Sequence, residues 1–153
     1  MYSKKETSQL RQEFWTAFGY YMSPVLSAEG EKINWVNYRT GEKDIFFRMN
    51  ADNKLASIGI EITHKDAGLR AFYFEQFIQI KSALRESLRE DWTWIPQVQN
   101  EYGKMISFIF TTLENKSILE RSDWPELITF FKPRIIALNQ FWIDAKYWFE
   151  VLR

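Results

Sequence analysis

The stretch that decides the fold is residues 44–63, DIFFRMNADNKLASIGIEIT. Apolar and polar side chains alternate on both sides of a polar break, and β-branched and aromatic residues are frequent. Alternation with a period of two is typical of a half-buried strand. The stretch therefore predicts a β-hairpin, with strands Asp44–Asn50 and Leu55–Thr63 joined by a turn at Ala51–Lys54.

The alternation also predicts how these two strands pair. A slip by one residue would turn one apolar set toward water, so the two sets must share the core face. We expect three core pairs: Ile45 with Ile60, Phe47 with Ile58, and Met49 with Ala56. On the opposite face, this register places Asp44 opposite Glu61 and Phe46 opposite Gly59.

Helical and strand patterns continue on both sides of the hairpin. Ser3 and Glu6 have the spacing of a capping box, and helical periodicity then runs to Ser23–Pro24. Asp66 can cap a second helix that runs to about Arg89. Strand patterns occur in three further segments: Ile33–Tyr38, Trp92–Gln99 and Lys104–Thr112. Pro96 donates no ladder hydrogen bond, so we expect its strand to lie at a sheet edge.

A long helix is predicted near the end of the chain. Asp123 and Glu126 again have capping-box spacing, and Pro133 is expected to kink or split the helix. Its apolar positions recur every three or four residues: Phe131, Ile135, Leu138, Trp142, Ala145, Phe149 and Leu152. The order α-β-β-β-α-β-β-α predicts an α+β fold in one domain, residues 1–153, with three main helices and a mainly antiparallel five-stranded sheet.

Composition excludes several classes of function. Lys+Arg and Asp+Glu balance at 20 each, so no overall positive charge indicates a nucleic acid partner. Without cysteine there is no disulfide and no thiolate site. The polar start and the lack of an apolar run of about 18 residues predict a cytoplasmic protein without membrane contact.

Common catalytic motifs are missing from the sequence. It contains no phosphate-binding loop, dinucleotide fingerprint or nucleophile elbow. His64 is the single histidine, and we interpret it as a polar loop residue, with a proton carrier as the alternative. These absences predict no cofactor. They favour a non-enzymatic binding or protein-interaction module over an enzyme.

One pair of carboxylates keeps a catalytic alternative open. Asp44 and Glu61, opposite each other in the expected register, would repel unless a cation lies between them. A divalent metal with Glu75 as third ligand would provide it, and so would Lys43, Arg48 or Lys65. The element order with acids on two neighbouring strands resembles the PD-(D/E)xK nuclease core. Thr63 replaces that motif's lysine and Lys43 replaces its proline, so the alternative function is a degenerate nuclease or a nucleic-acid-associated accessory domain.

The aromatic share of 18% exceeds what one small core needs. No basic cluster accompanies the rings, so stacking on nucleic acid is possible but is not indicated. Phe141 and Trp148 lie beside the apolar positions of the last helix, and we expect them to stay uncovered and to join subunits. A homo-oligomer or a protein partner is therefore expected. The competing explanation is that the first helix covers these rings, through Phe14, Trp15 and Phe18.

Several short segments carry a resemblance to a known family. They are Arg11–Trp15, Ile33–Trp35, Gly59–Ile62, Phe74–Phe77, Asp123–Pro125 and Phe131–Arg134. On these, the chain resembles the bacterial domain-of-unknown-function family 4268 over nearly its full length. The resemblance implies a bacterial cytosolic protein without an assigned activity. Related domains behind nuclease-like modules would place it in a defence or nucleic acid context.

Overall fold

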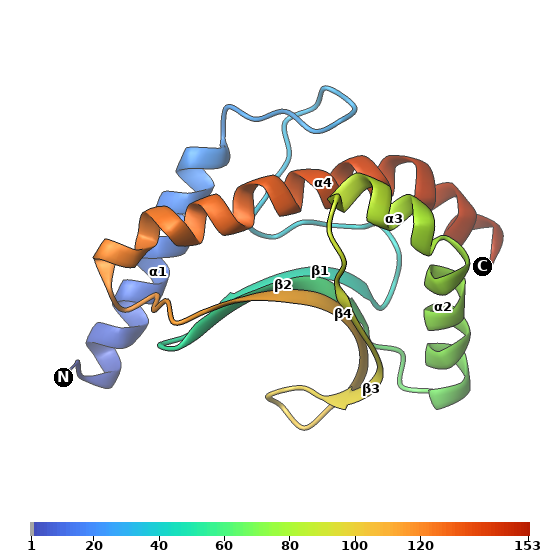
Figure 1. The fold of residues 1–153 in the computed structure, drawn as a ribbon, viewed down its shortest axis with the longest axis horizontal. Coiled ribbons are helices and arrows are strands. Elements are labelled where there is room, and N and C mark those ends of the chain that lie inside the picture. The colour runs from blue at the N-terminus through green and yellow to red at the C-terminus, as the bar shows by residue number, and fades with distance from the viewer. Residues whose placement is uncertain (1) are drawn as a thin grey trace.

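The computed structural model describes residues 2–153, and within them four strands form one antiparallel sheet (Figure 1). The strands are β1 (Ile45–Ala51), β2 (Leu55–Ile62), β3 (Thr93–Gln99) and β4 (Met105–Glu114). They lie in the order β1-β2-β4-β3, so β3 is an edge strand, as Pro96 predicts. The α+β class and the antiparallel sheet are confirmed.

The prediction of a strand at Ile33–Tyr38 is wrong, and the sheet formed by the described residues has four strands rather than five. The segment belongs to the long loop that precedes β1. The side chain of Asn34 accepts hydrogen bonds from the backbone N–H groups of Val36 and Asn37, both at 3.1 Å, and so makes a turn. Trp35 is buried in the core, which explains the apolar pattern of the segment.

The expected register between β1 and β2 is wrong by two residues. The observed core pairs are Ile45 with Ile62, Phe47 with Ile60, and Met49 with Ile58. A shift by two keeps the same side chains on the core face, so the alternation cannot distinguish the two registers. The turn decides between the two registers. The carboxylate of Asp52 accepts hydrogen bonds from Lys54 N at 2.7 Å and Leu55 N at 2.9 Å, and this turn places Ala51 opposite Ala56.

In the part of the chain that the structure describes, four α-helices accompany the sheet, one more than expected. They are α1 (Lys4–Met22), α2 (Ala67–Gln79), α3 (Lys81–Leu88) and α4 (Trp124–Val151), with a short 3₁₀ turn η1 (Arg121–Asp123) before α4. The Ser3–Glu6 capping box and the Asp66 cap are both confirmed. The helix expected over residues 66–89 divides into α2 and α3 at Ile80, whose φ of −111° and ψ of 22° are not helical.

Helix α4 differs in two details from its prediction. Pro133 does not split it, and Figure 1 shows one continuous, bowed helix. The guanidinium of Arg134 donates a hydrogen bond to Phe130 O at 3.0 Å within that turn. Asp123 does not cap the helix through its side chain; instead, its carboxylate accepts a hydrogen bond from Ser117 N at 2.9 Å.

The core lies between the helices and one face of the sheet (Figure 1). Ile58, Ile60 and Ile62 of β2 are fully buried against the apolar positions of α4, which confirms the packing face predicted for that helix. Helix α1 crosses the start of α4 through Phe14 and Phe18, which contact Phe131. Within residues 2–153, no helix combines the length and apolar character that a membrane span requires. None of the helices within residues 2–153 covers the opposite face of the sheet (Figure 1).

Candidate functional site

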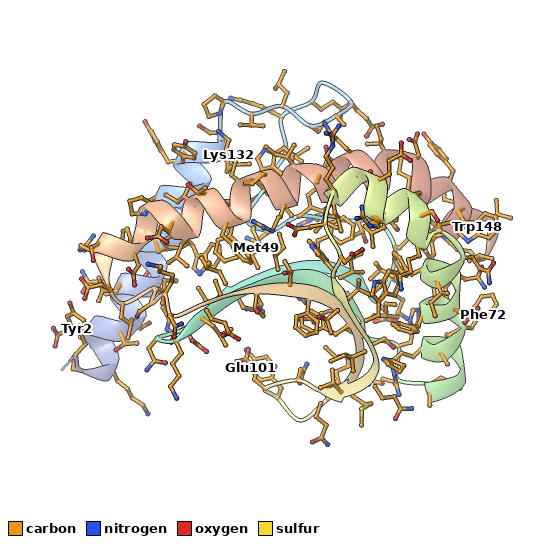
Figure 2. The ribbon with its side chains drawn as sticks, in the orientation of Figure 1. Tyr2, Met49, Phe72, Glu101, Lys132 and Trp148 are labelled. Carbon is orange, nitrogen blue, oxygen red and sulfur yellow. The ribbon has the colours of Figure 1, made fainter. Side chains whose placement is uncertain are left out.

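The uncovered face of the sheet is hollowed into a cleft of about 1160 Å³, here called the concave cleft. Strands β3 and β4 curl, and the turn between them folds back beneath the sheet (Figure 1). Figure 2 places Glu101 on this turn, below the cleft. The residues that matter for its chemistry are Phe46, Arg48, Glu61, Glu101, Tyr102, Phe108 and Phe110.

Gly59 shapes the floor of the concave cleft. It lies opposite Arg48 on β1 and Phe110 on β4, which corrects the expected pairing with Phe46. A Cβ atom there would lie 2.6 Å from Phe108 Cε1 and 2.7 Å from Phe110 Cβ. Because no side chain occupies this position, the Phe108 and Phe110 rings stack at a centroid distance of 4.4 Å and an interplanar angle of 9°.

Glu61 is the partly buried acid of the concave cleft. It lies between Phe46 on one neighbouring strand and Phe108 on the other. Its side chain is 12% exposed, and its Oε1 lies 3.6 Å from Nε of Arg48. The guanidinium carbon of Arg48 in turn lies 4.2 Å from the centroid of the Phe46 ring. A carboxylate, a cation and aromatic faces therefore meet at one point on the sheet.

Burial raises the pKa of the Glu61 carboxyl above its ordinary value of 4.5, and the Arg48 charge offsets part of this effect. The folded state then binds the proton more tightly than the unfolded chain. Stability from this group is present below the ordinary pKa and is lost as pH rises through the raised pKa.

Glu61→Gln should therefore make the protein more stable than the wild type at pH 7, with the difference vanishing as pH falls below the ordinary glutamate value. Urea unfolding at several pH values measures this. The control is Glu75→Gln, which changes an exposed carboxylate on α2. A Glu61→Gln protein less stable than the wild type at pH 7 would mean that the Arg48 ion pair outweighs the burial of the charge.

The three carboxylates proposed from sequence do not form one group. Asp44 lies opposite Thr63 rather than Glu61, and its Oδ1 accepts a hydrogen bond from Thr63 Oγ1 at 3.3 Å. Glu75 accepts a hydrogen bond from Gln79 on the surface of α2. In the part of the chain that the structure describes, no three His, Asp or Glu side chains are placed to hold a metal ion. The two-residue register error accounts for the separation of Asp44 from Glu61.

His64 lies in the loop between β2 and α2, as expected, but its side chain is buried there. Its ring stacks on Tyr73 at 4.4 Å, and its backbone oxygen accepts a hydrogen bond from Arg70 at 2.8 Å. Burial lowers the pKa of His64, and Asp44 opposes that effect. The buried Nδ1 has no hydrogen-bond partner within residues 2–153. The geometry makes His64 a core residue at the strand-to-helix junction.

The two rings proposed for an interface have different environments. Phe141 is buried beside Phe77, which corrects the expectation that its ring stays uncovered. Trp148 is 46% exposed, and its Nε1 donates a hydrogen bond to Gln76 on α2 at 3.2 Å. Figure 2 shows Trp148 and the exposed Phe72 at the same end of the molecule. A role for Trp148 in an interface stays a prediction.

The sequence predicted neither the stacked Phe108 and Phe110 rings at the floor of the concave cleft nor the position of Arg48 over the Phe46 ring. One signal was present: a glycine within a strand often marks the close approach of another group. The alternating Phe108 and Phe110 had no obvious partner in the sequence, because β2 and β4 are separated along the chain by two helices and β3.

Fold and site define a class of protein: an α+β domain whose antiparallel sheet has helices on one face and an aromatic, charged cleft on the other. The chain belongs to the family described as Domain of unknown function (DUF4268), whose model matches residues 10–146. No curated protein and no solved structure matches it.

Proposed function

We propose that this domain is a non-enzymatic binding module that holds a polypeptide segment of a partner protein in the concave cleft. The single observation that carries the proposal is the uncovered sheet face, hollowed to about 1160 Å³ and lined by rings and charges. Drug-sized ligands are generally bound in more enclosed pockets of about 300–1000 Å³. A cleft that spans four strands fits a longer ligand.

The charges around the concave cleft favour a polypeptide over a nucleic acid. Three cationic and four anionic side chains line it: Arg11, Arg48, Lys104, Asp44, Asp52, Glu61 and Glu101. A polyanion would need an excess of cations to release its counterions. The mixed charge and the stacked rings suit a chain that carries polar, charged and apolar groups together.

Both edges of the sheet are poorly suited to pairing with a further strand, so we expect the bound segment to lie on the open face of the sheet. At the β1 edge, Thr40 Oγ1 donates a hydrogen bond to Ile45 O at 2.7 Å, and Arg11 donates one to Ala51 O at 3.0 Å. At the β3 edge, Pro96 has no N–H to donate. Such edges disfavour the addition of another strand.

The degenerate nuclease is the weaker candidate, because Asp44 and Glu61 are not paired and Arg48 already neighbours Glu61. A bacterial cytoplasmic setting, which the resemblance implies, belongs to the same proposal. A nucleic-acid accessory role remains the alternative that binding assays address directly.

Selection of random peptides displayed on phage, followed by affinity measurement of the enriched peptides, tests the function. Tyr102 lines the concave cleft, whereas Tyr20 lies on α1, and both are 84% exposed. Tyr102→Ala should weaken peptide binding about tenfold, since an exposed tyrosine at an interface contributes roughly 1–2 kcal/mol. Tyr20→Ala should leave it unchanged.

Three outcomes would count against this function. No peptide is enriched, or both tyrosine variants bind the peptides as the wild type does. Alternatively, a fluorescent single-stranded oligonucleotide binds more tightly than the peptides, which would favour the nucleic acid alternative.

We also expect self-association through Trp148, which is exposed at the same end of the molecule as Phe72. Trp148→Glu should shift a dimer toward the monomer, because it places a charge in an apolar contact. Tyr147→Glu is the control, since Tyr147 is also exposed but projects from another side of α4. Sedimentation equilibrium measures the mass; a wild type of 18.4 kDa at high concentration would contradict the expectation.

A further inference from the structure

We propose that the concave cleft selects a cationic side chain, arginine or lysine, and holds it between the Glu61 carboxylate and the neighbouring phenylalanine rings. The inference deepens the proposed function, because the cation would be supplied by the bound polypeptide. In the free protein, Arg48 takes the place of this cation and is displaced when the segment binds.

Glu61 has fewer donors than other partly buried carboxylates of the chain. Glu42 accepts hydrogen bonds of 3.0 and 2.7 Å from Arg153. Glu90 accepts two of 2.9 Å from Arg134 and one of 2.7 Å from Trp92. Glu61 has one ion pair at 3.6 Å, longer than a hydrogen bond. An ionised carboxylate can accept about four hydrogen bonds, so Glu61 retains capacity for a further donor.

The surroundings of Glu61 attract a cation from two directions. Phe46 and Phe108 flank it on the neighbouring strands, and the Phe110 ring extends the aromatic surface. The π-face of an aromatic ring attracts a guanidinium or ammonium group. The Glu101 charge, on the turn below, raises the pKa of Glu61 and the Lys104 charge lowers it, so charges of both signs act on this carboxyl from the turn.

Arg48 shows that a guanidinium is compatible with this place. Its guanidinium carbon lies 4.2 Å from the centroid of the Phe46 ring, and its Nε lies 3.6 Å from Oε1 of Glu61. Its side chain is 48% exposed, and its ion pair with Glu61, at 3.6 Å, is longer than a hydrogen bond. A long ion pair whose cation is half exposed contributes little to stability, so exchange of Arg48 for a better-placed cation has a low cost.

The test uses two small probes of the same shape, Nα-acetyl-arginine methylamide and its uncharged analogue Nα-acetyl-citrulline methylamide. Backbone amide shifts of the ¹⁵N-labelled protein are followed at low salt. The arginine probe should shift the amides of Gly59, Glu61 and Phe108, and the citrulline probe should not. Glu61→Gln should weaken binding at least about fivefold. Glu75→Gln, outside the cleft, should not change it.

Arg48→Ala separates displacement from simple addition. Removal of the internal cation should strengthen binding of the arginine probe by about fivefold, whereas a supporting role for Arg48 would weaken it. Weaker binding to Arg48→Ala would overturn the displacement. Equal shifts with both probes, or binding unaffected by Glu61→Gln, would overturn the cation site.

The failure of this inference differs from the failure of the proposed function. If the peptides that bind the cleft are not enriched in Arg or Lys, the cation site is contradicted and the proposed binding of a polypeptide is still supported. If the arginine probe shifts the amides but the phage selection yields no binding peptide, the cation site is supported and the polypeptide ligand is contradicted.

Discussion

Trp142→Ala should lower the free energy of unfolding by about 3–5 kcal/mol, the usual cost of removing a buried tryptophan side chain. Trp142 is 2% exposed and packs edge-on against Phe47 at a centroid distance of 5.6 Å. Its Nε1 also donates a hydrogen bond of 2.7 Å to Thr40 O. The substitution leaves both a cavity and a buried carbonyl without its donor.

Urea unfolding followed by circular dichroism measures this loss. Tyr147→Ala is the control on the same helix, since that side chain is 57% exposed, and its loss should stay below about 1 kcal/mol. Trp142→Phe keeps a ring but not the donor, so its effect should be intermediate. A loss for Trp142→Ala as small as the control would show that the core does not depend on this contact.

Gly59→Ala should cost about 3 kcal/mol, although it adds one methyl group. The new Cβ atom would lie 2.7 Å from the backbone oxygen of Ile109, as well as too close to the Phe108 and Phe110 side chains. A side chain could rotate away, but a backbone oxygen moves only if β2 and β4 separate. The stacked pair in the concave cleft should be disturbed together with the sheet.

Ser57→Ala is the control for Gly59→Ala, because Ser57 lies on the same strand and lines the same cleft. It should change stability by less than about 1 kcal/mol. Thermal unfolding compares the two proteins, and aromatic proton shifts report on the stacked rings. A Gly59→Ala protein with unchanged stability and unchanged ring shifts would show that the floor is loosely packed.

Local patterns predicted the elements better than their relations. The Ser3 and Asp66 caps depend on a few neighbouring residues, and both are confirmed. The packing face of α4 depends on helical periodicity alone, and nearly all of its predicted apolar positions, from Phe131 to Leu152, are buried. The strand expected at Ile33–Tyr38 failed because Asn34 bonds to its own backbone, a contact that hydropathy does not record.

The candidate site was harder to predict because it depends on pairing between distant segments. The hairpin register was wrong by an even number of residues, to which alternation is insensitive. That error alone placed Asp44 opposite Glu61 and suggested a metal pair. The contact of Gly59 with Phe108 and Phe110 needs β4 beside β2, and nothing local in either strand specifies that neighbour.

The division of the sheet into a buried face and an open face has a consequence for protein engineering. Side chains at successive positions of β1, β2 and β4 face different surroundings, so the proposed recognition and the folding would depend on interleaved sets of residues. Randomising the codons of Phe46, Arg48, Ser57 and Phe110 would vary the open face, and with it the proposed binding of a polypeptide, while the isoleucines of the core stay constant. Gly59 must stay constant in such a library, because a side chain there would clash with β4. The domain would then serve as a scaffold in which other positions of the open face are varied.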